Sequence, residues 1–162
     1  MSEARFTGFD FSDAGIAAAR LEAERKGLAN ARFDKRDAAH LGQVDRFDFI
    51  TTFDAVHDQA RPDLVLAGIA EALRPGGVYL CVDTSASSKL AENLDHPLGP
   101  FLYTVSCMHC MTVSLADGGM GLGTMWGEQT ARKMIGEAGF TSIRTAQLDG
   151  DIVNTHIIAS KG

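Results

Sequence analysis

The chain has 162 residues, of which 45% are hydrophobic and 22% charged, and its formal net charge is −6. This composition can fill one packed core, so we expect a single domain over residues 1–162. The acidic excess would repel a phosphate backbone, which argues against nucleic acid as a partner. The sequence shows no apolar run of membrane-spanning length and no signal-peptide pattern, and its 3 cysteines favour free thiols, so we expect a cytoplasmic protein without a membrane partner.

Short apolar or β-branched runs alternate with helical patterns along most of the chain. Strands are expected at residues 5–9, 31–35, 46–53, 78–82, 142–148 and 155–160. Helices are expected at residues 13–26, from Pro62 to the break at Pro75-Gly76-Gly77, and at residues 128–138. This alternation predicts an α/β fold of the Rossmann-like type, with a mostly parallel sheet and helices on both faces.

Residues 84–125 interrupt the alternation. They are rich in Ser, Gly, Met and Cys and show no regular period, so we expect an irregular insertion on the substrate side of the domain. The methionines of this segment and Trp126 either line an apolar pocket for a small acceptor or pack as core.

Aspartates stand at the ends of four predicted strands, namely Asp10, Asp37, Asp54 and Asp83. Ligands of an open parallel sheet collect beyond the carboxyl ends of its strands, so these four side chains are expected to face one binding rim. Taken singly, each of them could instead form a turn or cap a helix.

Four segments in this order carry a family resemblance: 6–12 (FTGFDFS), 35–38 (KRDA), 47–58 (FDFITTFDAVHD) and 73–77 (LRPGG). Together they resemble motifs of class I S-adenosylmethionine-dependent methyltransferases. Residues 106–115 and 121–127 are similar to a bacterial, mycobacterial-type subgroup that acts on small molecules. The resemblance implies S-adenosylmethionine as cofactor and methyl transfer to a small-molecule acceptor as the reaction.

The resemblance also implies roles for particular residues. By that match Asp10 binds the ribose hydroxyls and Phe11 lies beside the adenine. Asp37 would accept a hydrogen bond from the adenine amino group, and Ala38 would offer its backbone N–H. Asp54 would border the methyl-donor end of the cofactor.

One part of the family pattern has no match at the start of this sequence. The family's first strand and the glycine-rich loop after it are missing, so we expect either a truncated methyltransferase fold or a sheet that closes by another pairing. An open strand edge would favour self-association into a homo-oligomer. Residues 117–123 (DGGMGLG) could replace the loop in a circularly permuted domain, although a flexible loop within the insertion is the simpler interpretation.

His57 is the candidate catalytic base, because it follows the third predicted strand and an imidazole suits proton transfer near neutral pH. Asp58 or Asp54 could orient its ring, and the alternative is a histidine that only bonds neighbouring backbone. Cys107 and Cys110 form a C-x-x-C pair without a second pair at ligand spacing, so the sequence predicts no metal site.

Two other functions stay open at this stage. The chain could be a fragment of a longer methyltransferase that cannot bind the cofactor itself, which leaves the activity of this chain alone undecided. It could also be a nicotinamide-dependent oxidoreductase, since an acidic residue after the second strand of that fold binds the ribose of NAD.

Overall fold

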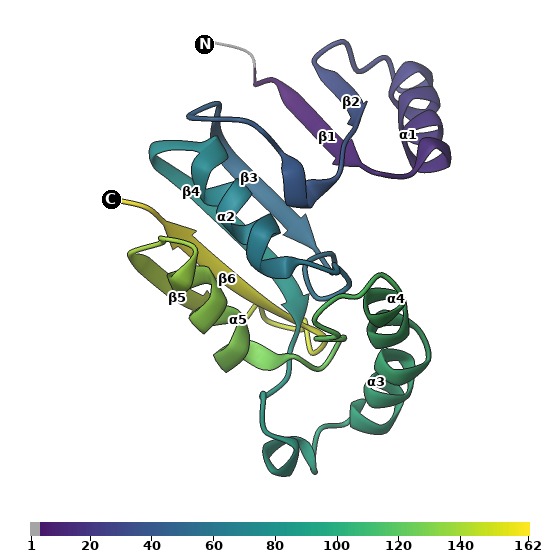
Figure 1. The fold of residues 1–162 in the computed structure, drawn as a ribbon, viewed down its shortest axis with the longest axis vertical. Helices are drawn as coiled ribbons and strands as arrows, with labels where there is room; N and C mark the ends of the chain where they lie inside the picture. Colours follow the sequence, from purple (N-terminus) through teal and green to yellow (C-terminus); the bar gives the residue numbers. More distant parts are fainter. Residues whose placement is uncertain (1–3) are drawn as a thin grey trace.

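A computed structural model of the chain describes residues 4–162, whose strands form two separate sheets (Figure 1). The first sheet contains two parallel strands, β1 (Phe6–Asp10) and β2 (Ala31–Lys35). The second has the order β3-β4-β6-β5 and contains β3 (Phe47–Phe53), β4 (Leu73–Thr84), β5 (Ser142–Ala146) and β6 (Asn154–Ser160). Only β6 runs antiparallel to its neighbours, so the prediction of a mostly parallel sheet is confirmed.

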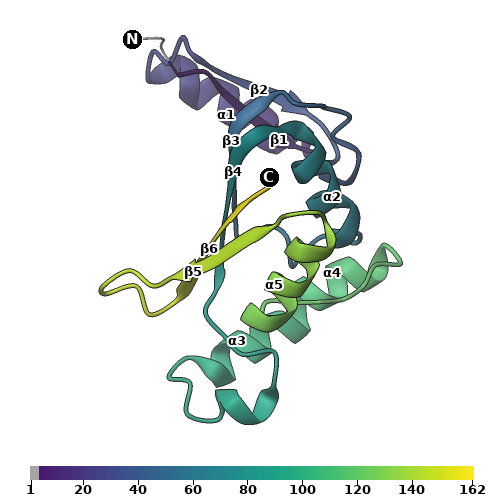
Figure 2. The ribbon, with the colours of Figure 1, turned by 90° about the vertical axis from the view of Figure 1, so that its left-hand side faces the viewer.

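Helices lie on both sides of this arrangement. α2 (Pro62–Ala72) and α5 (Gly127–Glu137) cover one face of the four-stranded sheet, whereas α1 (Asp13–Arg25) packs against β1 and β2 on the other side (Figure 2). Within residues 4–162 we find no helix of the length and apolar character that a bilayer crossing requires.

The core lies between α2, α5 and the four-stranded sheet. One stripe of α2, which consists of Leu66, Ile69 and Ala70 at the spacing i, i+3, i+4, is buried there together with Leu73 and Tyr79 of β4. Phe49 and Phe53 alternate with the core-facing Ile50 along β3 and are 55% and 63% exposed, so they lie on the face of β3 that α2 does not cover.

The predicted break at Pro75-Gly76-Gly77 lies inside β4 rather than between a helix and a strand. Helix α2 ends at Ala72, and β4 begins at once but shifts its register against β3 between Leu73 and Val78. Gly76 has a φ of 75°, a conformation that glycine adopts without strain, so this tripeptide forms the irregular start of β4.

The prediction that residues 84–125 are irregular is wrong for much of the segment. It contains the 3₁₀ turn η2 (Leu90–Asn93) and a continuous helical run of α3 (Gly99–Val105), the π-helical turn η3 (Ser106–Cys110) and α4 (Met111–Ala116). The buried positions of the later part, Ser106, Cys110 and Ser114, recur every four residues but are small and polar. A buried stripe without large apolar side chains gives no hydrophobic period, which is why the sequence did not reveal this helix.

The two sheets meet without sharing backbone hydrogen bonds. β1 pairs only with β2, and β3 pairs only with β4. The sheets touch instead through side chains: the rings of Phe9 and Phe47 meet edge to face with centroids 6.1 Å apart. In the part of the chain that the structure describes, the sheet therefore does not close by an alternative pairing of β1 with β3.

Candidate functional site

The four predicted aspartates do lie at the carboxyl ends of their strands. Asp10 ends β1, Asp37 follows β2, Asp54 follows β3, and Asp83 is the next-to-last residue of β4. In Figure 1 the arrowheads of β1, β3 and β4 point the same way, so these ends face one rim of the molecule.

Asp10 and Asp37, the predicted cofactor ligands, have local backbone partners. One carboxylate oxygen of Asp10 accepts the Ser12 N–H at 2.8 Å, and Asp37 caps η1 (Ala38–His40) by accepting the Ala39 N–H at 2.9 Å. The His40 ring, 2.8 Å from the second oxygen of Asp37, holds the pKa of that carboxyl below its usual value. Both aspartates are exposed. Each carboxylate therefore bonds to the backbone of its own turn and still faces solvent at the rim.

The other two residues assigned to the adenosine portion differ in burial. Phe11 is 68% exposed, whereas Ala38 is half-buried and packs against the core. Their proposed contacts with adenine stay predictions.

Asp54 turns the chain at the end of β3. Its φ of 44° is left-handed, a conformation that aspartate tolerates better than most residues, and its N–H donates to the Val82 carbonyl at 3.0 Å. Partial burial and the neighbouring Asp83 carboxylate raise the pKa of Asp54. This turn brings His57, three residues later, beside the end of β4.

His57 is buried between two carboxylates. Its Nδ1 lies 2.7 Å from an Asp83 oxygen, and the same oxygen accepts the Thr84 N–H at 2.8 Å. Its Nε2 lies 3.1 Å from Oδ1 of Asp58. Asp83, which the sequence did not assign to this role, therefore holds the ring at Nδ1, and Asp58 faces the other nitrogen. Because β3 and β4 are parallel neighbours, the end of β4 lies beside the end of β3, and this pairing was the signal that could have identified Asp83.

The two carboxylates determine the charge of His57. Burial by itself would lower the pKa of the imidazole, but the contacts with Asp58 and Asp83 outweigh it and raise the pKa to about 11. Burial likewise favours a higher pKa for Asp58, yet His57 and the Cys110 thiol lower it. His57 is thus an imidazolium in this arrangement, and its role as a base stays a prediction that requires Asp58 to leave Nε2.

The helical run after β4 completes this cluster. Cys110 of η3 is 5% exposed and approaches Asp58, and its sulfur accepts a hydrogen bond from the Thr124 hydroxyl at 2.9 Å. α4 is fixed to the segment directly after Asp58, because the Ser114 hydroxyl donates to the Gln59 carbonyl at 3.0 Å. A residue far along the chain thus reaches the cluster through tertiary packing alone.

The glycine string of residues 117–123 packs tightly rather than forming an open loop. A side chain at Gly119 would approach the Ala60 Cα to 2.4 Å, and one at Gly123 would approach the Ser106 Oγ to 2.2 Å. The string follows helix α4 (Met111–Ala116) rather than a strand. The helix before it removes the strand-loop context that a circularly permuted cofactor loop requires.

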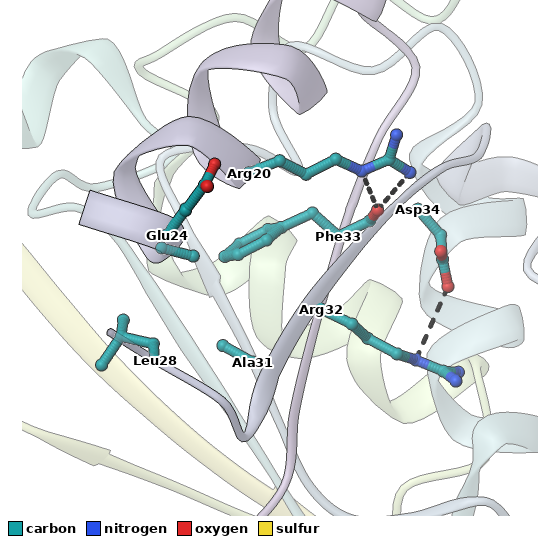
Figure 3. Close-up of a pocket in the computed structure, with 8 residues that line it drawn as sticks. Arg20, Glu24, Leu28, Ala31, Arg32, Phe33 and Asp34 are labelled. Carbon is teal, nitrogen blue, oxygen red and sulfur yellow. Dashed lines mark hydrogen bonds and ion pairs between the residues drawn. The ribbon is translucent and has the colours of Figure 1, made fainter. Parts of the chain in front are cut away.

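The methionine-rich segment does not form one apolar lining. Met125 and Trp126 are buried in the core region, but Met108 and Met120 are 77% and 51% exposed. One cavity, of about 340 Å³, lies between α1 and β2 (Figure 3) and includes Arg20, Leu28 and Phe33 but none of the predicted site residues.

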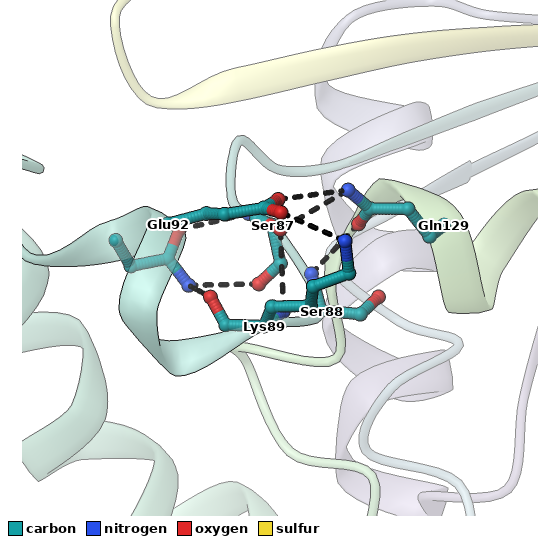
Figure 4. Close-up of polar contacts among 6 residues, drawn as sticks. Ser87, Ser88, Lys89, Glu92 and Gln129 are labelled. Carbon is teal, nitrogen blue, oxygen red and sulfur yellow. Dashed lines mark hydrogen bonds and ion pairs between the residues drawn. The ribbon is translucent and has the colours of Figure 1, made fainter.

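A second cavity, of about 270 Å³, lies just beyond the end of β4. Its walls are largely polar and include Ser87, Glu92 and Gln129. Figure 4 shows how these side chains fix the loop after β4 to the start of α5: the Gln129 amide donates to the Ser87 hydroxyl at 3.0 Å, and Ser87 donates to Glu92. This polar cavity, rather than a methionine-lined pocket, lies next to the Asp83 end of the rim.

Comparison with known proteins identifies the family. The family model described as a methyltransferase domain matches residues 1–139 of this chain. The chain belongs to the methyltransferase-domain family. The match to this family displaces the alternative of a nicotinamide-dependent oxidoreductase.

Individual relatives support the same family. The chain is 35% identical over 90 residues to a fatty-acid O-methyltransferase of Mycolicibacterium smegmatis, which covers 55% of this chain and 32% of that protein. It is 30% identical over 86 residues to a ubiquinone biosynthesis O-methyltransferase of Cereibacter sphaeroides, covering 53% and 35%. The chain thus spans about a third of the length of these curated relatives.

A solved structure shows the same fold. The trans-methyltransferase CalH in complex with SAH superimposes with a TM-score of 0.72 at 17% identity, over 98% of this chain and 43% of that one. The methyltransferase domain therefore shares its architecture with a protein of much different sequence.

Proposed function

We propose that this methyltransferase domain takes part in S-adenosylmethionine-dependent methyl transfer to an oxygen atom of a small-molecule acceptor. The observation that carries the proposal is the buried His57–Asp83 pair, which lies on the same rim as the exposed Asp10 and Asp37. Two O-methyltransferases among the relatives and the SAH-bound CalH structure support both the cofactor and the kind of acceptor.

The residues at the rim fit the adenosine portion of the cofactor. Asp10 and Asp37 end neighbouring parallel strands and are exposed, so their carboxylates can accept hydrogen bonds from ribose hydroxyls and from the adenine amino group. Phe11, mostly exposed beside Asp10, offers an apolar surface to the adenine ring. Asp54 lies nearer the histidine, toward the methyl-donor end. Within residues 4–162 no strand is followed by a glycine-rich loop, so the contacts assigned to this chain are those with the adenosine portion and the one at Asp54.

The cofactor, when bound, supplies an electrophilic methyl group on a sulfonium. The task of the chain is to orient the acceptor oxygen and, for a hydroxyl acceptor, to remove its proton. His57 is proposed first to give its Nε2 proton to Asp58, which turns away and releases it to solvent, and Nε2 of the neutral ring then accepts the proton of the acceptor hydroxyl. Asp83 positions the ring through Nδ1 and stabilises the charge that the ring gains.

Cofactor binding tests the first half of the proposal. We expect the chain to bind S-adenosylhomocysteine in a calorimetric titration and Asp10→Ala to weaken binding about tenfold or more, because hydrogen bonds to a charged group contribute roughly 1.5–3 kcal/mol each. Asp48→Asn is the matched control, since Asp48 is exposed at the opposite end of β3. Absence of binding by the unaltered chain would show that the chain alone does not bind the cofactor.

The role of His57 is tested by methyl transfer from radiolabelled cofactor to a hydroxyl acceptor. We expect His57→Gln to lower kcat by about 10²–10⁴-fold, the usual contribution of a general acid or base, and Asp83→Asn to lower it less. KM should change little in both variants. A His57→Gln protein with unchanged kcat would remove this residue from the chemistry.

A further inference from the structure

The cluster around His57 carries more negative charge than its one imidazole can balance. Three carboxylates, those of Asp54, Asp58 and Asp83, have an oxygen within 4.8 Å of a ring nitrogen of His57. Among residues 4–162, the ion pairs of Asp58 and Asp83 are with His57, and Asp54 has none. Asp83 is buried and Asp58 is partly buried, and a buried carboxylate is stable only when a cation or hydrogen bonds compensate it.

Two oxygens of the cluster lack hydrogen-bond partners. Oδ2 of Asp83 is buried without a partner in a residue that is only 3% exposed. Oδ1 of Asp58 is also a buried atom without a hydrogen bond of good geometry, although it lies 3.1 Å from Nε2 of His57. Buried carboxylate oxygens without a hydrogen-bond donor indicate that a bound ion or molecule from outside the protein contacts them.

The ligand atoms of His57, Asp58 and Cys110 all lie within 4.8 Å of one another. In a tetrahedral zinc site the ligand atoms, about 2.0–2.3 Å from the ion, are roughly 3.3–3.8 Å apart. The three side chains therefore need only small adjustments to share one ion. The donor set of one imidazole nitrogen, one carboxylate oxygen and one sulfur is the mixture that borderline-soft divalent ions such as Zn²⁺ prefer.

The surroundings also prepare these atoms for a metal. Asp83 accepts from Nδ1 of His57, which leaves Nε2 as the ligating nitrogen, the arrangement of a carboxylate–histidine–metal unit. The Thr124 hydroxyl donates to the Cys110 sulfur at 2.9 Å, a contact that orients the sulfur toward the cluster. The π-helical turn η3 that carries Cys110 is a feature often found at functional sites.

We propose that His57, Asp58 and Cys110 form a binding site for a divalent transition metal of the zinc class, with Asp83 as the carboxylate behind the histidine. Three protein ligands leave one position of a tetrahedral ion open, and the Asp58 side chain, 33% exposed, marks its solvent side. Metal binding depends on the cluster alone. An ion at this site would occupy Nε2 of His57, so in the metal-bound state an acceptor oxygen bound at the open position would replace proton removal by His57. Only this consequence for catalysis rests on the proposed function.

Metal titration of the chain tests the site. After removal of metals with a chelator, we expect the chain to bind one equivalent of Zn²⁺ in competition with a chromophoric chelator, and Co²⁺ to give the absorption band of a thiolate ligand. Asp83→Asn should weaken Zn²⁺ binding about 10–100-fold, as loss of an outer carboxylate does elsewhere, and Cys110→Ser should weaken it more and abolish the thiolate band. Cys107→Ser is the matched control, because Cys107 is exposed on the same helical turn.

The outcomes separate this inference from the proposed function. If the Cys110→Ser chain binds Zn²⁺ as tightly as the unaltered chain, the proposed metal site is wrong. The proposed methyl-transfer function does not depend on that result. Tight binding that Cys110→Ser removes, in a variant whose circular dichroism spectrum is unchanged, would support it. His57→Gln should also weaken Zn²⁺ binding. If that variant does not fold, the comparison of Cys110→Ser with Cys107→Ser still tests the metal site.

Discussion

The N-terminal unit, β1–α1–β2 over residues 6–35, and the four-stranded unit, residues 47–160, are held together differently. In the N-terminal unit the buried apolar side chains are Ile16 and Ala23, and Phe6 and Leu21 are 59% and 68% exposed. The four-stranded unit encloses nearly all of the core, including Leu66 and other fully buried side chains.

This difference separates the two proposed tasks of the domain. Of the residues assigned to the cofactor, Asp10 belongs to the lightly packed part, whereas Asp37 lies between the two units and caps η1, which packs against the core; both hold their geometry through local caps. The His57–Asp83 pair lies in the well-packed part, where burial fixes its distance. Ligand binding can therefore order the first region, whereas the second is ordered by its own core.

The largest expected effect comes from core truncation. Leu66→Ala should reduce the free energy of unfolding by about 2–5 kcal/mol, because it leaves a cavity at a fully buried position. Leu21→Ala, at an exposed position of α1, should change it by less than ~0.5 kcal/mol. Denaturant unfolding followed by fluorescence of Trp126, the one tryptophan of the chain, measures both. Similar losses in the two variants would contradict the contrast in packing.

An intermediate effect is expected at the cap of α1. The Ser12 hydroxyl accepts the Gly15 N–H at 3.1 Å, and Ser12→Ala should destabilise the helix by about 1 kcal/mol. Hydrogen exchange should accelerate at the amides of α1 and stay unchanged in β4, because the N-terminal unit opens separately. Equal acceleration in β4 would show instead that both units unfold together.

The smallest effect is expected for a surface ion pair that joins β3 to β4. Arg74 contacts Asp48 at 2.6 Å, with 49% and 83% of their side chains exposed. Asp48→Asn should therefore change the free energy of unfolding by less than ~1 kcal/mol in the same denaturant experiment. A larger loss would mean that charge, rather than burial, joins these strands.

Local signals in the sequence predicted most of the elements correctly. The helix predicted from residue 13 and the strands predicted at residues 31–35 and 78–82 depend on neighbouring residues, and the structure confirms each of them. The helical run of residues 99–116 was missed because, after Leu102, its buried stripe consists of serine and cysteine. A period of small polar residues cannot be told apart from a loop by hydrophobicity.

The sequence by itself determined the order of strands and helices, the aspartates at the strand ends and the family to which the chain belongs, because those features are written in local pattern and in short motifs. The tertiary structure alone decided which carboxylate holds His57 and that Cys110 lies beside Asp58. Those contacts join residues 26 or more positions apart, and their geometry follows from the register of β3 on β4 and from the docking of α4. The spacing of these residues along the chain predicts neither the contact of His57 with Asp83 nor that of Cys110 with Asp58.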